Sequence, residues 1–143
     1  MANPREWDAL LATSAKARPG NHVTDLLGCP RRKALLREGA PVDLTRLERR
    51  LEGSILHWAL AMVDPGTAEV AVAGVLFDVP VVGSVDRLRE GHVRDYKNPD
   101  GKHKPDGAWP DQAWQLETYR VLLAQMGIDT RGWTLHVRWR GEW

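Results

Sequence analysis

At 143 residues, with 43% hydrophobic and 27% charged side chains, the chain has the size and composition expected of a single globular domain over residues 1–143. No apolar run approaches the roughly 20 residues that cross a bilayer, and the start lacks a secretory signal, so we expect a cytoplasmic protein with no membrane partner. Cys29 is the only cysteine, which excludes an internal disulfide. The chain has 20 basic and 19 acidic residues, so its net charge does not indicate a nucleic-acid partner, and any such contact would depend on local basic patches.

The first part of the chain predicts helices. An amphipathic pattern that stops at Pro19-Gly20 makes residues 1–23 an N-terminal helical extension. A second helical stretch follows over residues 24–39, with Pro30 at a new first turn. Its basic side includes Arg31, and this side is either an ordinary solvated face or a phosphate contact.

A longer helix is predicted to open at Thr45, which has the capping-box spacing to Glu48. Its apolar residues predict a buried stripe, made of Leu47, Leu51, Ile55, Trp58 and Met62. His57 lies on a neighbouring strip of the same helix. Taken alone, a histidine there is more often a hydrogen-bonded core residue than a ligand, unless the helix brings it to the carboxylates described next.

Alternating apolar residues replace the helical pattern after residue 66. Segments 67–74 and 75–82 predict two strands, and residues 83–97 predict a hairpin that turns at Glu90-Gly91. Counting back from this turn places Asp86 opposite Asp95, and Lys97 projects from the same face of the sheet. These three side chains form either a surface ion-pair network or a divalent-metal site, because hard ions take carboxylate oxygens.

The rest of the chain predicts a loop, a helix and a strand. Residues 98–111 are rich in turn formers and carry Lys102 and Lys104, so they form either a plain connection or a basic clamp on a substrate. The helix ends at Gly127, and the closing residues alternate as one last strand. The predicted order is α-α-α-β-β-β-β-α-β, an α/β (α+β) arrangement with a central mixed sheet flanked by helices.

Four short motifs occur in the order GSILH (53–57), GSVD (83–86), DYK (95–97) and QLETY (115–119). Each is weak alone, but together they resemble the PD-(D/E)XK nuclease superfamily. Within it, the match resembles the RecB-like branch, which includes the CRISPR-associated Cas-four-type exonucleases. The resemblance implies a restriction-endonuclease-like core.

The resemblance also implies roles for particular residues. Mg²⁺ or Mn²⁺ would be held by His57, Asp86, Asp95 and the main-chain carbonyl of Tyr96. Asp86, Asp95 and Lys97 would be the catalytic set, in which Lys97 orients the attacking water. The residues predicted to contact DNA are Gln115, Tyr119, Lys102, Lys104 and Arg31.

Two departures from the family pattern matter. Iron-sulfur relatives carry four cysteines, whereas this chain has only Cys29, so no iron-sulfur cluster is expected. Asp95 stands where many members of the superfamily have Glu, although Asp also occurs in the RecB-like branch.

The expected activity is metal-dependent hydrolysis of DNA phosphodiester bonds, as an exonuclease or at single strands and duplex ends. The alternative is a DNA-binding or partner-regulating protein that keeps the fold without turnover. An RNA-directed nuclease is not separated from these by sequence, and the chain is compatible with a protein partner or a homo-oligomer.

Overall fold

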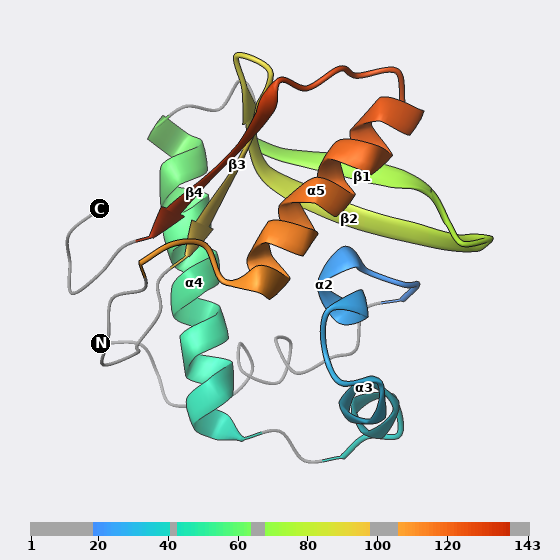
Figure 1. Cartoon of the computed structure of the whole chain (residues 1–143). Coiled ribbons are helices and arrows are strands. Elements are labelled where there is room, and N and C mark those ends of the chain that lie inside the picture. Colours follow the sequence, from blue (N-terminus) through green and yellow to red (C-terminus); the bar gives the residue numbers. More distant parts are fainter. Residues whose placement is uncertain (1–18, 41–42, 64–67, 98–105, 138–143) are drawn as a thin grey trace.

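The computed structural model describes residues 19–40, 43–63, 68–97 and 106–137 (Figure 1). Its elements in chain order are α2 (Val23–Leu26), α3 (Pro30–Arg37), α4 (Leu44–Val63), β1 (Ala68–Leu76), β2 (Val79–Arg89), β3 (His92–Lys97), α5 (Pro110–Gln125) and β4 (Gly132–Val137). No helix in these ranges is both long and apolar enough to cross a bilayer.

The strands form one mixed sheet in the order β1-β2-β3-β4. Neighbours β1, β2 and β3 run antiparallel, whereas β4 runs parallel to β3. Parallel neighbours need a crossover connection, and here α5 provides it. The fold class predicted from the sequence, a mixed sheet flanked by helices, is confirmed.

The predicted strand over residues 75–82 does not exist as a separate element. Instead, β1 ends at Leu76, and Phe77 and Asp78 form a tight turn with φ angles of 50° and 63° before β2 begins. The described part of the chain therefore has one strand fewer than predicted. The turn escaped prediction because Phe seldom adopts a positive φ and the apolar residues continue across it.

The second hairpin follows the prediction. Glu90 and Gly91 have φ angles of 54° and 76°, the left-handed conformation that a two-residue turn of this kind needs. Arg89 pairs with His92 and Arg87 with Arg94, which is the predicted register.

The core lies between the sheet and α5. Buried apolar side chains of α2, the first three strands and α5 form it: Val23, Val72, Val81, Val85, Val93, Leu116, Tyr119, Leu122 and Leu123.

The end of α5 is joined to β1 by the side chain of Gln125. Its Nε2 donates to the Val75 carbonyl and its Oε1 accepts from the Val75 N–H, both at 2.9 Å. Gly127 follows the helix with a φ of 78°, as predicted for its end.

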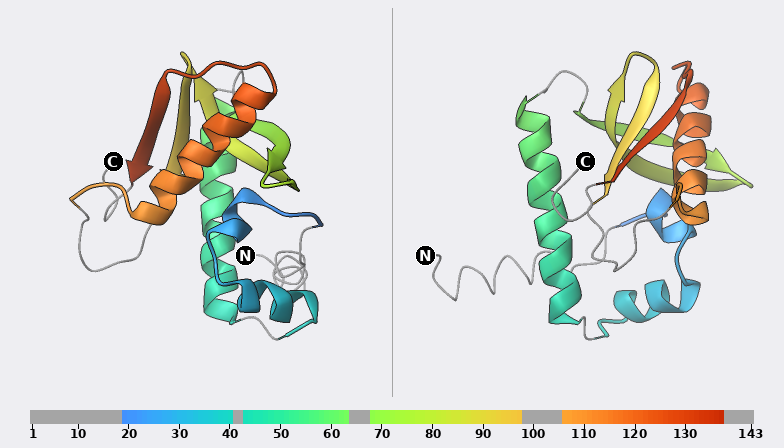
Figure 2. Two further views of the ribbon diagram at one scale, coloured as in Figure 1. Left: turned by 45° about the vertical axis from the view of Figure 1, so that its right-hand side comes forward. Right: turned by 60° about the vertical axis from the view of Figure 1, so that its left-hand side comes forward.

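Helix α4 lies on the other side of the sheet from α5 (Figure 2). Its predicted buried stripe is wrong: Leu47 is buried, but Ile55, Trp58 and Met62 are exposed. Only the C-terminal half of the helix meets the sheet, and it does so through a neighbouring face, where Arg87 of β2 donates to the Leu60 carbonyl at 2.7 Å. The rotation brings His57 toward the strands.

The N-terminal helix predicted before Pro19 lies outside the described residues. The segment that follows it runs beside the sheet, where the N–H of Val82 donates to the carbonyl of Asn21 at 2.9 Å. His22 makes a parallel bridge with the same residue of β2. This contact places α2 against the strand that carries the GSVD motif.

Candidate active site

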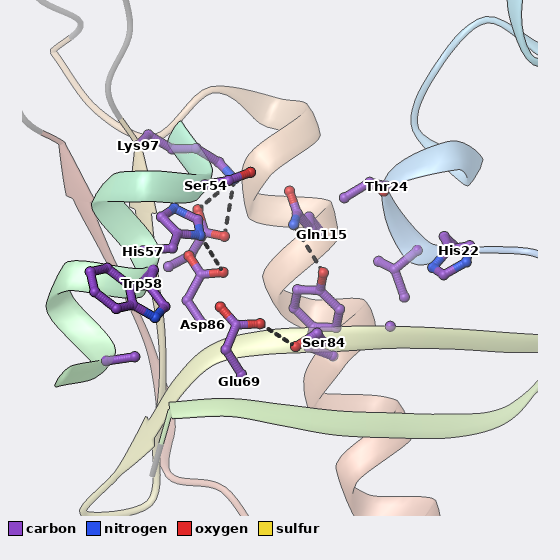
Figure 3. A pocket seen from close by; sticks show the side chains of 15 residues that line it. His22, Thr24, Ser54, His57, Trp58, Glu69, Ser84, Asp86, Lys97 and Gln115 are labelled. Atoms are coloured by element: carbon purple, nitrogen blue, oxygen red, sulfur yellow. Dashed lines mark hydrogen bonds and ion pairs between the residues drawn. The ribbon is translucent and has the colours of Figure 1, made fainter. Parts of the chain in front are cut away.

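Residues from the four motifs meet around one cavity of about 480 Å³ (Figure 3). Helix α4 forms one wall, α5 and α2 form others, and β2 and β3 supply the floor. The predicted site residues that line it are His57, Asp86, Asp95, Lys97, Gln115 and Tyr119. These positions are far apart in sequence, so the fold brings together the residues that the motifs single out.

His57 reaches from α4 to the backbone of β3. Its Nε2 lies 2.9 Å from the carbonyl oxygen of Tyr96, and its Nδ1 lies 3.4 Å from Asp86 Oδ1. A carbonyl can only accept, so Nε2 carries the proton in this hydrogen bond. The hydrogen bond at Nε2 fixes the imidazole with Nδ1 toward Asp86, as in metal sites where a histidine ligand is oriented by its other nitrogen.

Asp86 lies where the regular strand pairing stops. The ladder between β1 and β2 joins Ala68 to Arg87 and Val70 to Val85 but passes over Asp86. Its Oδ2 instead accepts a 2.8 Å hydrogen bond from the N–H of Tyr96. The side chain thereby takes a bond that a strand neighbour would otherwise make, which fixes its direction.

The electrostatic environment of Asp86 disfavours its charge. Burial, followed by the like charge of Asp95, raises the pKa of Asp86 from 3.8 to about 6, although His57, the hydrogen bond from Tyr96 and Lys97 act in the opposite direction. The net effect is a carboxylate that is still ionised at neutral pH but lacks sufficient positive charge nearby. A cation placed there would relieve this deficit.

Asp95 and Lys97 form a close pair on the same face of β3, as their spacing predicts. Lys97 Nζ donates to Asp95 Oδ1 at 3.0 Å and lies 2.9 Å from Oδ2. Asp95 is 3% exposed, whereas the lysine is half-buried and reaches into the cavity. The buried carboxylate therefore holds an ammonium group beside the cavity.

Gln115 and Tyr119 lie on one face of α5, as predicted, and both are buried. Gln115 Nε2 donates to the Tyr119 hydroxyl at 3.1 Å. The ring packs directly over Gly83, because a Cβ built on that glycine would lie 2.8 Å from Tyr119 Cε1. The glycine of the GSVD motif thus leaves room for the tyrosine of the QLETY motif.

Glu69 is a site residue that the sequence reasoning missed. It lies on β1 opposite Asp86 and has a φ of 52°, a conformation that a glutamate in a strand rarely adopts. Its Oε2 accepts a 2.8 Å hydrogen bond from the Ser84 hydroxyl, and the side chain points into the cavity. A strained backbone that aims a carboxylate into a cavity is the pattern expected of a functional residue.

The donor atoms in this cavity fit a divalent cation. Ligand atoms of His57, Glu69 and Asp86 all lie within 4.8 Å of one another. In an octahedral shell at 2.0–2.1 Å, adjacent ligands are about 3.0 Å apart. The 3.4 Å separation of His57 Nδ1 from Asp86 Oδ1 is close to that value. The carbonyl of Tyr96 accepts from His57 here, so its role as a direct ligand stays a prediction.

The remaining predicted DNA contacts are not brought to this cavity. Arg31 is exposed on α3 and is absent from the described cavity lining, so its contact with DNA stays a prediction. Lys102 and Lys104 lie outside the described residues.

Comparisons with known proteins identify the fold and the family of this chain. The chain can be superposed on the crystal structure of SSO0001 with a TM-score of 0.68 at 20% identity, over 95% of this chain and 73% of that one. At this identity the similarity shows a shared fold and nothing more specific. No curated protein matches the sequence. Residues 8–138 match the family model of the PD-(D/E)XK nuclease superfamily, to which this chain belongs.

Proposed function

We propose that this protein is a metal-dependent deoxyribonuclease of the RecB-like branch, formed by one nuclease domain over residues 1–143 and acting on single strands or duplex ends. Membership of a nuclease superfamily gives the reaction class. The observation that carries the proposal is the convergence of His57, Asp86 and the Asp95–Lys97 pair on one cavity.

The metal ligands in this proposal are His57 Nδ1, Asp86 and Asp95, with the carboxylate of Glu69 and the carbonyl of Tyr96 as further candidates. Nucleases of this superfamily generally use divalent metal ions. Bound there, Mg²⁺ or Mn²⁺ would lower the pKa of a water and polarise the scissile phosphate. The imidazole nitrogen among oxygen donors favours Mn²⁺ at least as much as Mg²⁺.

Lys97 has the task of orienting the attacking water and stabilising charge that develops on the phosphate. Its ammonium is already held by both oxygens of Asp95, so it needs little reorganisation when the substrate binds. No side-chain nucleophile is required, because water is the attacking group. Gln115 and Tyr119, which line the same cavity, would contact the DNA strand near the reacting phosphate.

The assignment to the RecB-like branch rests on the motifs GSILH, GSVD, DYK and QLETY, whose residues line one cavity. The cysteine pattern of iron-sulfur relatives is missing, since Cys29 stands alone and is exposed. We therefore propose a site that works without a cluster.

Cleavage of end-labelled single-stranded and duplex DNA by the purified protein with Mn²⁺ tests this function. Wild type should cleave, and Asp86→Asn and Lys97→Ala should each lose at least about 100-fold in rate. Asp78→Asn is a matched control, because Asp78 is an exposed acid in the β1–β2 turn. Substrates labelled at either end will separate exonuclease from endonuclease products.

Two results would contradict the proposal. One is absence of cleavage by the wild type with either metal. The other is equal cleavage by wild type and Asp86→Asn. Binding of DNA without turnover would instead support a DNA-binding protein on the same fold. Faster cleavage of labelled RNA than of DNA would indicate an RNA-directed nuclease.

A further inference from the structure

Trp58 follows His57 on α4 and is the most conspicuous exposed aromatic at the cavity. The side chain is 66% exposed, and it lines the cavity together with His57 (Figure 3). Other large apolar side chains of α4 are also exposed, namely Ile55, Met62 and Val63. Among these four, Trp58 alone lines the cavity.

The charges around the cavity make the exposed indole significant. Among the described lining residues, three are acidic, namely Glu69, Asp86 and Asp95, whereas Lys97 is the one lysine or arginine. The whole chain carries a net charge of only +1. Phosphate attraction by the protein is therefore weak at this site, and a bound strand needs another source of affinity.

Stacking on an aromatic ring supplies affinity without charge. It is sequence-tolerant, because every base has a flat π face, and it is little affected by salt. A base inside a duplex already stacks on its neighbours on both sides, so an enzyme can use its face only when the base is unpaired or extruded. An indole that lines the same cavity as the candidate metal ligands thus favours an unpaired nucleotide.

We propose that Trp58 is a stacking platform for an unpaired base next to the scissile phosphate, which makes single-stranded DNA or a frayed end the preferred substrate. This inference rests on the proposed nuclease function. Trp58 acts in binding, whereas the polar groups of the cavity act on the phosphate.

Equilibrium binding of fluorescein-labelled oligonucleotides, measured by anisotropy, tests the platform. Lys97→Ala is the background, since it leaves the carboxylates in place while blocking turnover. In this background, Trp58→Ala should bind single-stranded DNA about 5- to 150-fold more weakly, and Trp58→Phe should recover part of the loss. Met62→Ala is the matched control, because Met62 is 64% exposed on the same helix but does not line the cavity.

Oligonucleotides with one abasic site, moved stepwise along the strand, locate the stacked base. At one position the missing base should weaken binding by the protein with Trp58 intact and should cost nothing further in Trp58→Ala. The effect of Trp58→Ala should persist at high salt and should be absent on a blunt duplex. Because the abasic series needs no substitution at Trp58, it remains informative if Trp58→Ala folds poorly.

The outcomes separate this inference from the function on which it rests. If the wild type cleaves DNA while no abasic position matters and Trp58→Ala binds normally, the platform is wrong and the nuclease stands. An equal loss of affinity for single strands and duplexes in Trp58→Ala also overturns it. That result would indicate that Trp58 only helps to position His57 through packing. If the wild type neither binds nor cleaves any DNA, both proposals fail.

Discussion

Replacing Asp86 by asparagine should stabilise the metal-free protein while removing its activity. The asparagine keeps an oxygen that can accept from the N–H of Tyr96, which Asp86 contacts at 2.8 Å. What it removes is a negative charge that burial and Asp95 make unfavourable. Any gain in the free energy of unfolding therefore measures how much the charge of Asp86 destabilises the metal-free fold.

The magnitude follows from the pKa of Asp86, which rises from 3.8 to about 6 on folding. A carboxyl group with a higher pKa in the folded state lowers stability as pH rises, because the unfolded chain releases its proton first. The full penalty above pH 6 is about 3 kcal/mol, and at pH 5 it is roughly half of that. Asp86→Asn should recover up to this amount at pH 8 and less at pH 5.

Urea denaturation at pH 8 and pH 5, with a chelator present, measures the difference in the free energy of unfolding. Mn²⁺ at 1,000 times its dissociation constant should then reverse the order, since it adds about 4.1 kcal/mol to the wild type and little to the variant. Asp78→Asn controls for the loss of one acidic group. A gain that does not change with pH, or a variant less stable than wild type at pH 8, would refute the reasoning.

Three further changes test other parts of the structure. Gly83→Ala should destabilise the fold by about 1–3 kcal/mol and raise KM, because its Cβ would lie 2.8 Å from Tyr119 Cε1; urea unfolding and steady-state kinetics check this. Glu69→Gln should weaken Mn²⁺ binding in calorimetry, and unchanged affinity would exclude this carboxylate from the metal site. Phe77→Asn should raise stability in thermal unfolding, by up to about 1 kcal/mol, because Phe77 is 99% exposed at a φ of 50° and Asn tolerates this conformation better.

The sequence predicts the parts of the site that local rules determine. A two-residue turn at Glu90-Gly91 sets the register of its strands, and the register sets which side chains share a face. Asp95 and Lys97 are two residues apart on one strand, so the alternation of side chains predicts their closeness without any knowledge of tertiary structure. The order of the helices and the mixed sheet followed from periodicity and from the motifs.

Features that depend on how elements pack were not predictable in this way. The apolar stripe of α4 shows that the helix is amphipathic, but the residues that contact the sheet depend on the rotation of the helix, and Ile55 and Met62 remain exposed. Glu69 looks like a solvent-facing residue in an alternating strand, since neither its positive φ nor the interrupted pairing beside it has a sequence signal. Its place in the cavity depends on this backbone conformation, which the alternating sequence pattern does not indicate.

The side chain of Gln125 has a consequence for how this protein behaves at high concentration. Strand β1 is an outer strand, and an open strand edge is a template on which a second molecule can add its own strand. Both hydrogen-bonding groups of Val75 are occupied by the amide of Gln125, so this part of the edge offers nothing to an incoming chain. One amide group thus blocks self-association at this point of the sheet, without a charged residue or a proline there.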